Sequence, residues 1–374
     1  MIGLCLSLSL ISLIISVLLT RILLRVSHRL DMLDRAGSEL HKGHDGAVPN
    51  TGGMAVFWAV VGPITGIIIA VWVLPEEGWQ RLLPPLAIHI DGLRQVTAQA
   101  IGVVVALAAI HTIGLLDDRR GLGPFIKLLG QVLVAGGLVI WCDMRILSML
   151  GNVDSAWGGA GYVLSITISI AWLVTITNAF NFLDNMDGLA GGVAAIIAAV
   201  YLVATLLSGQ WFIAATAALL LGGLVGFLIF NFPPARIFMG DGGSLVVGLL
   251  AAMISIQTTY YHTDEPIPGR YWYGLLMPVL VMAIPLYDCI SVTIIRLMHG
   301  RSPFIGDHNH FSHRLVRKGM TRPQAVVVIW LCTAATALSG VMLGSLQTWQ
   351  AIIVTAQTVT ILLILALLER DSAR

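Results

Sequence analysis

Charged residues are scarce in this chain of 374 residues. Asp, Glu, Lys and Arg make up 11% of the sequence, whereas hydrophobic residues make up 57%. A soluble domain normally carries about a quarter charged residues, so this composition excludes an ordinary soluble globular protein. The formal net charge of +1 gives no indication of a nucleic-acid partner. The composition therefore predicts an integral membrane protein.

Cysteine is scarce as well. Internal repeats and low-complexity tracts are absent from the sequence. The four cysteines lie far apart, in or beside apolar segments: Cys5, Cys142, Cys289 and Cys332. Such spacing excludes a disulfide framework and a cysteine-based metal motif, and it favours a packing role for each thiol.

Long apolar segments are abundant instead. A membrane-spanning helix needs roughly 20 apolar residues. About eleven stretches qualify: 2–24, 51–74, 96–116, 126–142, 162–182, 189–207, 211–231, 244–258, 274–295, 324–345 and 350–368. The first has no basic segment before it and no cleavage site after it, so we expect a retained helix rather than a signal peptide. We predict an all-α, polytopic bundle of about eleven transmembrane helices, forming one domain over residues 1–374.

The distribution of basic residues predicts the orientation. If the connections between the helices are numbered along the chain, seventeen of the 21 Lys and Arg residues lie in the odd connections and the C-terminal tail. Basic residues concentrate on the cytoplasmic side of membrane proteins. The odd connections should therefore be cytoplasmic, with the N-terminus outside and the C-terminus in the cytoplasm.

Five polar clusters all fall in odd connections. They are His41–His44, Asp117 with Asp118, Asn181 with Asp184 and Asp187, Gly240–Ser244, and Asp307–Arg317. Scattered surface polarity would not be sorted to one side, because the even connections contain Asp and His as well. The sorting predicts one site at the inner membrane face, assembled from separate connections.

The pair Asp117-Asp118 directly follows an apolar run. Adjacent carboxylates repel each other unless a cation or a shared proton intervenes. The pair is consistent with a solvated helix end paired with Arg119 and Arg120, or with metal binding or proton transfer.

The segment NAFNFLDNMDG places Asn178, Asn181, Asp184 and Asp187 three residues apart. In an α-helix such a row drifts by about 60° per step, so the four can converge only if the helix unwinds near Asp184. Gly188 fits such a helix end. Capping with a polar turn is the alternative, although acids and amides at membrane depth are functional by default.

The segment FMGDGGS places Asp241 among three glycines, before an apolar helix that Ser244 could cap. Glycine-rich turns at helix N-termini bind phosphate, and an aspartate there would bring a cation to it. An ordinary tight turn has the same pattern, so the motif alone leaves both interpretations open.

The ninth connection carries His310, His313, Arg314 and Arg317 at helical spacing, with Asp307 at a plausible N-cap. The resulting cationic face suits phosphate groups. An amphipathic helix on anionic lipid is one alternative. A zinc site that adds His308 is another.

Two polar residues lie inside apolar stretches. Asp288 is either a site residue or the partner of a basic residue such as Arg296. His111 is best interpreted as a hydrogen-bonded core histidine.

Six segments in order resemble the polyprenyl-phosphate N-acetylhexosamine-1-phosphate transferases, glycosyltransferase family 4. They are HKGHDGAVPNTGG, GLLDDRRGLGPFIKLLGQ, NAFNFLDNMDGLAGG, NFPPARIFMGDGGS, PLYD and SPFIGDHNHFSHRLVRKG. The resemblance implies a membrane enzyme that joins a nucleotide-linked amino sugar phosphate to a lipid phosphate. It also implies a Mg²⁺ cofactor, with Mn²⁺ as an alternative.

The resemblance carries roles to the matching positions. Asp117 and Asp118 would engage the lipid phosphate, and Asp187 joins them as a catalytic residue. Asp241, with Asn181, would hold the metal ion. The implied substrate-binding residues are Lys42, His44, Asn181, Asp184, His310, His313 and Arg314.

The ninth connection also indicates a branch of the family. Its DHNHFSH resembles the branch that uses UDP-N-acetylglucosamine, not the three consecutive histidines of the phospho-N-acetylmuramoyl-pentapeptide transferases. Ser312 replaces the middle histidine of that branch, and Asn185 replaces a usual glycine.

We therefore expect transfer of N-acetylglucosamine-1-phosphate from a UDP-sugar to undecaprenyl phosphate, with release of UMP. The reaction would be the first step of a lipid-linked glycan pathway, at the cytoplasmic face of the bacterial inner membrane. A homodimer is compatible with this expectation. The pentapeptide transferase and, in another class, a transporter are the alternatives.

Overall fold

The computed structural model describes residues 1–29, 33–34, 48–82, 84–146, 158–258, 273–302 and 309–369. Four residues singled out above, Lys42, His44, Asp307 and His308, lie outside these ranges.

The described chain is almost entirely helical, with one pair of two-residue antiparallel strands. The strands are β1 (Leu33–Asp34) and β2 (Val48–Pro49). The helices are α1 (Ile2–Arg29), α2 (Gly52–Val73), α3 (Glu76–Leu82), α4 (Pro84–Ala87), α5 (Ile90–Gln95), α6 (Thr97–Arg120), α7 (Pro124–Trp141), α8 (Gly158–Leu183), α9 (Leu189–Leu207), α10 (Trp211–Asn231), α11 (Asp241–Gln257), α12 (Tyr273–Val281), α13 (Ala283–Met298), α14 (Phe311–Arg317), α15 (Arg322–Val341), the 3₁₀ turn η2 (Met342–Ser345) and α16 (Thr348–Glu369).

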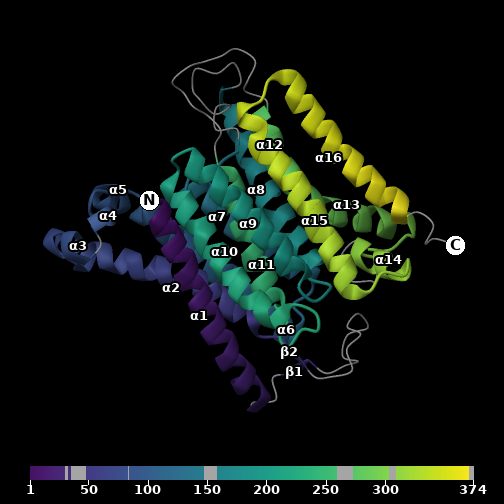
Figure 1. The fold of residues 1–374 in the computed structure, drawn as a ribbon, viewed down its shortest axis with the longest axis horizontal. Helices are drawn as coiled ribbons and strands as arrows, with labels where there is room; N and C mark the ends of the chain where they lie inside the picture. Colours follow the sequence, from purple (N-terminus) through teal and green to yellow (C-terminus); the bar gives the residue numbers. More distant parts are fainter. Residues whose placement is uncertain are drawn as a thin grey trace.

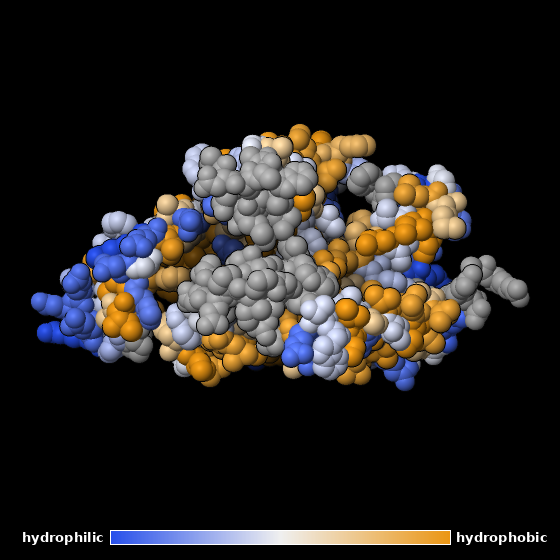
Figure 2. Space-filling model, turned by 90° about the horizontal axis from the view of Figure 1, so that it is seen from above, coloured by the Kyte–Doolittle hydropathy of each residue, from blue (hydrophilic) through white to orange (hydrophobic). Residues whose placement is uncertain are grey.

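This is an all-α, polytopic membrane protein. Within the described ranges, nine helices are long and apolar enough to cross a bilayer: α1, α2, α6, α7, α8, α9, α10, α15 and α16. Large apolar side chains such as Leu133 and Trp141, 67% and 89% exposed, point outward as lipid-facing residues do. Figure 2 shows orange, hydrophobic residues along the flanks, and blue residues gathered at the end of the molecule where α3 lies.

The apolar stretches predicted from the sequence coincide with these helices, with three differences. The stretch 274–295 is divided at Met282 into α12 and α13. The stretch 244–258 forms α11, which starts earlier, at Asp241, and with 17 residues is shorter than the nine long helices. The connection 75–95 contains three short helices, α3 to α5. The four cysteines are free thiols that lie buried or half-buried, which confirms that they form no disulfide framework.

The helices pack in a bundle around α9 and α11. Leu245, Val246 and Val247 of α11 are fully buried, as is Tyr201 of α9. At the edge, α1 packs along α10, because Ser12 and Ser16 donate to backbone carbonyls of that helix at 2.6 and 2.7 Å. Figure 1 shows α1, α10, α15 and α16 running diagonally in similar directions, with α3 at one end of the bundle and β1, β2 and α14 at the other.

Polar motifs of α6, α8 and α11 meet at the end that carries β2 and α14 (Figure 1). The last turn of α6, the last turn of α8 and the first turn of α11 come together there. Because α6 continues to Arg120, Asp117 and Asp118 belong to a helical turn and not to a loop.

Candidate active site

One face of α6 is pressed against the start of α11. Buried His111 stacks on Phe57 with ring centroids 4.2 Å apart, and its Nδ1 donates to the Gly242 carbonyl at 2.7 Å. One turn further, a Cβ on Gly114 would lie 2.4 Å from the Asp241 carbonyl oxygen. His111 is therefore the hydrogen-bonded core histidine that the sequence indicated, and it fixes the spacing between the two helices.

Asp118 is the next residue on this face, and it caps α11. Its Oδ1 accepts the backbone N–H of Asp241 and its Oδ2 accepts that of Gly242, each at 3.0 Å. Asn50 Nδ2 also donates to Oδ1, at 3.1 Å. A carboxylate at a helix N-terminus stabilises the positive end of the helix dipole. The preceding Gly240 has a φ of +67°, and a Cβ there would lie 2.9 Å from Asp118 Oδ2.

This arrangement decides two points that the glycine motif left open in the sequence. The first backbone N–H groups of α11 bind the chain's own carboxylate, so they do not form an open phosphate nest. Ser244 does not cap α11, because its hydroxyl accepts from Asn181 instead, at 2.9 Å.

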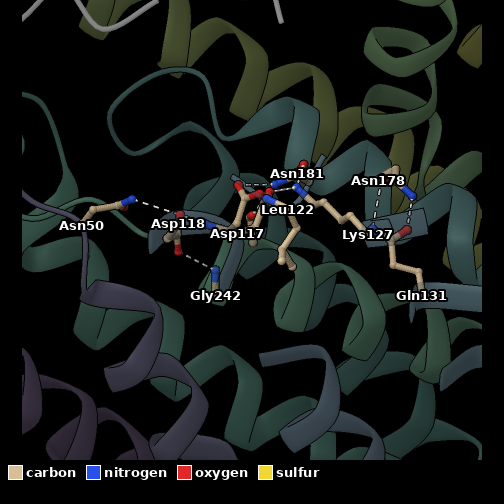
Figure 3. Close-up of polar contacts among 11 residues, drawn as sticks. Asn50, Asp117, Asp118, Leu122, Lys127, Gln131, Asn178, Asn181 and Gly242 are labelled. Atoms are coloured by element: carbon tan, nitrogen blue, oxygen red, sulfur yellow. Dashed lines mark hydrogen bonds and ion pairs between the residues drawn. The ribbon is translucent and has the colours of Figure 1, made fainter. Parts of the chain in front are cut away.

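Asp117 is directed toward Lys127 of α7, beside the Asp241 side chain of α11. The Lys127 ammonium lies 3.0 Å from Asp117 Oδ2 and 3.1 Å from Asn181 Oδ1, and it forms an ion pair with Asp241 Oδ2 as well. Its side chain is only 14% exposed. Residues from α6, α7, α8 and α11 thus converge on one cationic nitrogen, and Figure 3 shows the contacts running from Asn50 through the aspartate pair to Lys127.

Hydrogen bonds fix the direction of the Asn181 amide. Its Nδ2 donates to Asp241 Oδ1 at 2.8 Å, and its Oδ1 therefore faces Lys127. The Asp117 carboxylate is held similarly, since Oδ1 accepts the Leu122 N–H at 2.7 Å.

The donor set fits a divalent cation of the Mg²⁺ type. Two carboxylates and one amide oxygen, from Asp117, Asp241 and Asn181, already surround a positive charge, and Mg²⁺ prefers oxygen ligands of this kind. Across the parts of the chain that the structure describes, His, Cys, Asp and Glu form no group of three or more that is placed to hold a metal ion by itself. Mg²⁺ commonly completes its shell with water and substrate phosphates.

The polar residues at the end of α8 and in the turn after it have different partners. The helix ends at Leu183 and Gly188 has a φ of +72°, as the predicted unwinding required. Asn178, however, pairs with Gln131 of α7, and Asp187 Oδ2 accepts the Ala235 N–H at 3.0 Å. Asn181 contacts the Lys127 cluster, and buried Asp187 fastens the turn to the segment before α11.

Asp288 of α13 holds the His310 segment in place. Asp288 is fully buried, its Oδ2 lies 2.8 Å from His310 Nδ1, and its Oδ1 accepts the Phe311 N–H at 3.0 Å. His310 is the N-cap of α14 and precedes the helix, so the four basic residues do not share one helical face as predicted. Asp288 thus pairs with His310, and Arg296 lies over the Phe182 ring at 5.2 Å.

The other basic residues of this segment divide between interior and surface. Arg314 is buried and donates from Nη2 to Ser291 Oγ at 2.9 Å. His313 is half-buried and Arg317 is exposed. The last turn of α8 contacts both the Lys127 cluster and the His310 segment. Asn181 donates to Asp241, and the neighbouring Phe182 ring packs edge-on against His310, with ring centroids 6.0 Å apart.

Comparison with known proteins shows the family of this chain. The family model of glycosyl transferase family 4 matches residues 100–259. A decaprenyl-phosphate N-acetylglucosaminephosphotransferase of Mycobacterium tuberculosis (strain ATCC 25618 / H37Rv) is 31% identical over 321 residues, which cover 79% of this chain and 72% of that protein. The chain belongs to glycosyl transferase family 4.

Two further relatives extend the match over more of this family 4 chain. A probable undecaprenyl-phosphate N-acetylglucosaminyl 1-phosphate transferase of Bacillus subtilis (strain 168) is 26% identical, covering 92% of this chain and 86% of that protein. An undecaprenyl-phosphate alpha-N-acetylglucosaminyl 1-phosphate transferase of Escherichia coli (strain K12) is 28% identical, covering 85% and 78%.

The residues matched to family 4 contain Asp117, Lys127, Asn181 and Asp241, but they end before His310. Lys127 is the main residue that the sequence interpretation missed, because it was counted only as a basic residue near a membrane surface. A usable signal was present: Lys127 and Gln131, one turn apart, are the polar side chains of the otherwise apolar α7. A lysine within an apolar helix is functional by default.

Proposed function

We propose that this chain transfers N-acetylglucosamine-1-phosphate from UDP-N-acetylglucosamine to undecaprenyl phosphate and releases UMP. The names of the relatives support the donor and the acceptor, since all three describe an N-acetylglucosamine-phosphate transferase that uses a polyprenyl phosphate. The site supports the reaction type, because phosphoryl transfer between two anions depends on positioning and on neutralising charge.

The observation that carries the proposal is the convergence of Asp117, Asn181 and Asp241 on the Lys127 ammonium. Four helices supply these groups at one end of the bundle. A cationic centre held by oxygen atoms suits a diphosphate, whereas a transporter site would lie near the middle of the helices.

The proposed reaction forms one P–O bond and breaks another. A phosphate oxygen of the lipid attacks the β-phosphorus of the donor, the bond to the α-phosphate oxygen breaks, and UMP leaves with that oxygen. If the lipid phosphate arrives protonated, Asp117 takes the proton, because its carboxylate lies in the Lys127 cluster and can accept more hydrogen bonds than those from Leu122 and Lys127. We favour this direct attack over a covalent aspartyl intermediate, which would release UMP in a burst without lipid phosphate.

The other residues have positioning roles in this proposal. Asp118 holds the backbone of Asp241, and Asn181 sets the direction of its carboxylate. Asp288 accepts the Nδ1 hydrogen of His310, so Nε2 is the ring nitrogen directed to the donor diphosphate, to which the doubly protonated ring can donate together with the Arg314 guanidinium.

We also propose that Mg²⁺ binds at Asp241 and Asn181. When bound, it would neutralise phosphate charge that Lys127 alone cannot balance. A readout independent of turnover is available, because a cation held by these groups should raise the melting temperature of the free protein.

The proposed setting is the cytoplasmic face of the bacterial inner membrane. Eleven spans, formed by the nine long helices with α11 and the α12–α13 pair, would leave the N-terminus outside and the C-terminus inside. The strong bias of basic residues toward one side supports this orientation. Cysteines introduced at Arg120 and Arg94, both distant from the membrane interior in this scheme, should react with an impermeant reagent from opposite sides.

A donor panel tests the proposal. Purified protein in detergent, with Mg²⁺ and undecaprenyl phosphate, should release UMP from UDP-N-acetylglucosamine. UDP-N-acetylmuramoyl-pentapeptide and UDP-glucose should release far less. Preference for the pentapeptide donor would move the chain to the peptidoglycan branch, and no release from any donor would favour a transporter.

A further inference from the structure

One partly buried hydrogen bond joins α14 to the turn between α8 and α9. Ser312 of α14 donates its hydroxyl to Oδ1 of Asn185, in the turn between α8 and α9, at 2.5 Å. The residues are 127 positions apart in the sequence. Ser312 is fully buried, so its hydroxyl depends on this protein partner and not on water.

The Asn185 amide is itself held in place. Its Nδ2 donates to the Phe182 carbonyl at 2.7 Å, which turns Oδ1 toward α14 and ties the turn to the end of α8. The amide therefore presents a fixed acceptor to Ser312.

The pair connects the two groups of proposed substrate-binding residues. Asn185 lies between Asp184 and Asp187, while Ser312 lies between His310 and Arg314. On its other side α14 is held by Asp288 and Ser291 of α13. The Asn185–Ser312 bond thus sets where α14 stands relative to the turn.

We infer that Asn185 and Ser312 act as one positioning pair that sets the distance of His310 and Arg314 from the α8–α9 turn, and so controls affinity for the diphosphate of the nucleotide-sugar donor. The inference rests on the proposed function. Because neither side chain lies among the groups around Lys127, the pair should affect donor binding and leave the transfer step unchanged.

A double-mutant cycle tests the pair. Asn185→Ala, Ser312→Ala and the double variant are assayed with varied UDP-N-acetylglucosamine and fixed undecaprenyl phosphate. Each single change should raise the donor KM about two- to tenfold, the value of one hydrogen bond, with kcat within about twofold. The rise in donor KM in the double variant should equal that of a single variant and not the product of the two single rises, because each substitution removes the same bond.

Ser255→Ala is the matched control. Ser255 is also buried, and it accepts from Trp172 at 2.9 Å near the far end of α11, so its loss should leave the donor KM unchanged. If the Ser312 variant does not fold, Asn185→Ala supplies the test from the less buried side of the pair.

Three results would overturn the inference and leave the proposed function standing. They are an unchanged donor KM in the single variants, a rise in KM in the double variant equal to the product of the two single rises, and a fall in kcat alone. No turnover by the unaltered protein with UDP-N-acetylglucosamine would overturn the proposed function itself.

Discussion

Asp118 and Asp241 are joined through the backbone: the carboxylate of the first accepts the N–H of the second at 3.0 Å. The paired aspartates of α6 therefore have different surroundings. Asp118 is directed at the first turn of α11, whereas Asp117 is directed at Lys127. This difference allows their contributions to be separated by mutation.

Asp118→Ala should reduce both stability and activity. Two backbone N–H groups of α11 lose a charged acceptor, which we expect to cost about 2–4 kcal/mol of unfolding free energy. Melting followed by intrinsic fluorescence measures the first effect and UMP release the second. Asp117→Asn, the matched comparison, should lower kcat about 100-fold or more with little change in melting temperature. Equal melting losses in the two variants would contradict the assignment.

Lys127→Met should abolish most turnover, by about 100-fold or more, because the carboxylates of Asp117 and Asp241 lose the charge between them. Lys318→Met, at an exposed site after α14, is the control and should behave like the unaltered protein. Near-normal activity of the Lys127 variant would show that the ammonium is not part of the site.

Asp288→Asn should lower kcat/KM about 10- to 100-fold by disturbing the hydrogen on His310 Nδ1. The amide retains an oxygen that can accept from Phe311, so the fold of α14 should survive. If His310 is the route of the effect, adding Asp288→Asn to His310→Ala should cause little further loss. If the double variant instead loses the full additional factor in kcat/KM, Asp288 acts independently of His310.

Asp241→Ala should remove the effect of Mg²⁺. In the unaltered protein we expect Mg²⁺ to raise the melting temperature and to be required for UMP release, with both lost on chelation. The Asp241 variant should remain folded but inactive, with a melting temperature that Mg²⁺ no longer changes. Retained turnover in this variant would remove the metal assignment.

The sequence predicted most of the fold because the chain is dominated by apolar helices. Spans such as 189–207 and 211–231 coincide with α9 and α10. In lipid, a continuous apolar segment of bilayer length satisfies its own backbone hydrogen bonds as an α-helix. The division at Met282 and the extension of α6 through Asp117 were not predictable from hydropathy, because polar helical turns resemble loops in composition.

The site was predictable in its residue types and less so in its contacts. Asp117, Asn181 and Asp241 were expected to share a site, and the structure brings all three to Lys127. The use of the α11 N-terminus by Asp118 could not be foreseen, since it depends on how closely α6 approaches α11 at Gly114. Residues that hold others in place carry little local signal, because their partners lie far away in the sequence.

The most direct measurement follows the β-phosphate of the donor. UDP-N-acetylglucosamine radiolabelled at that phosphate is incubated with the protein, Mg²⁺ and undecaprenyl phosphate, and the lipid is extracted. The account predicts that the label enters the lipid fraction in step with UMP release, and that Asp241→Ala prevents both. Label that stays in the aqueous phase while sugar enters the lipid, or no lipid product at all, would contradict it.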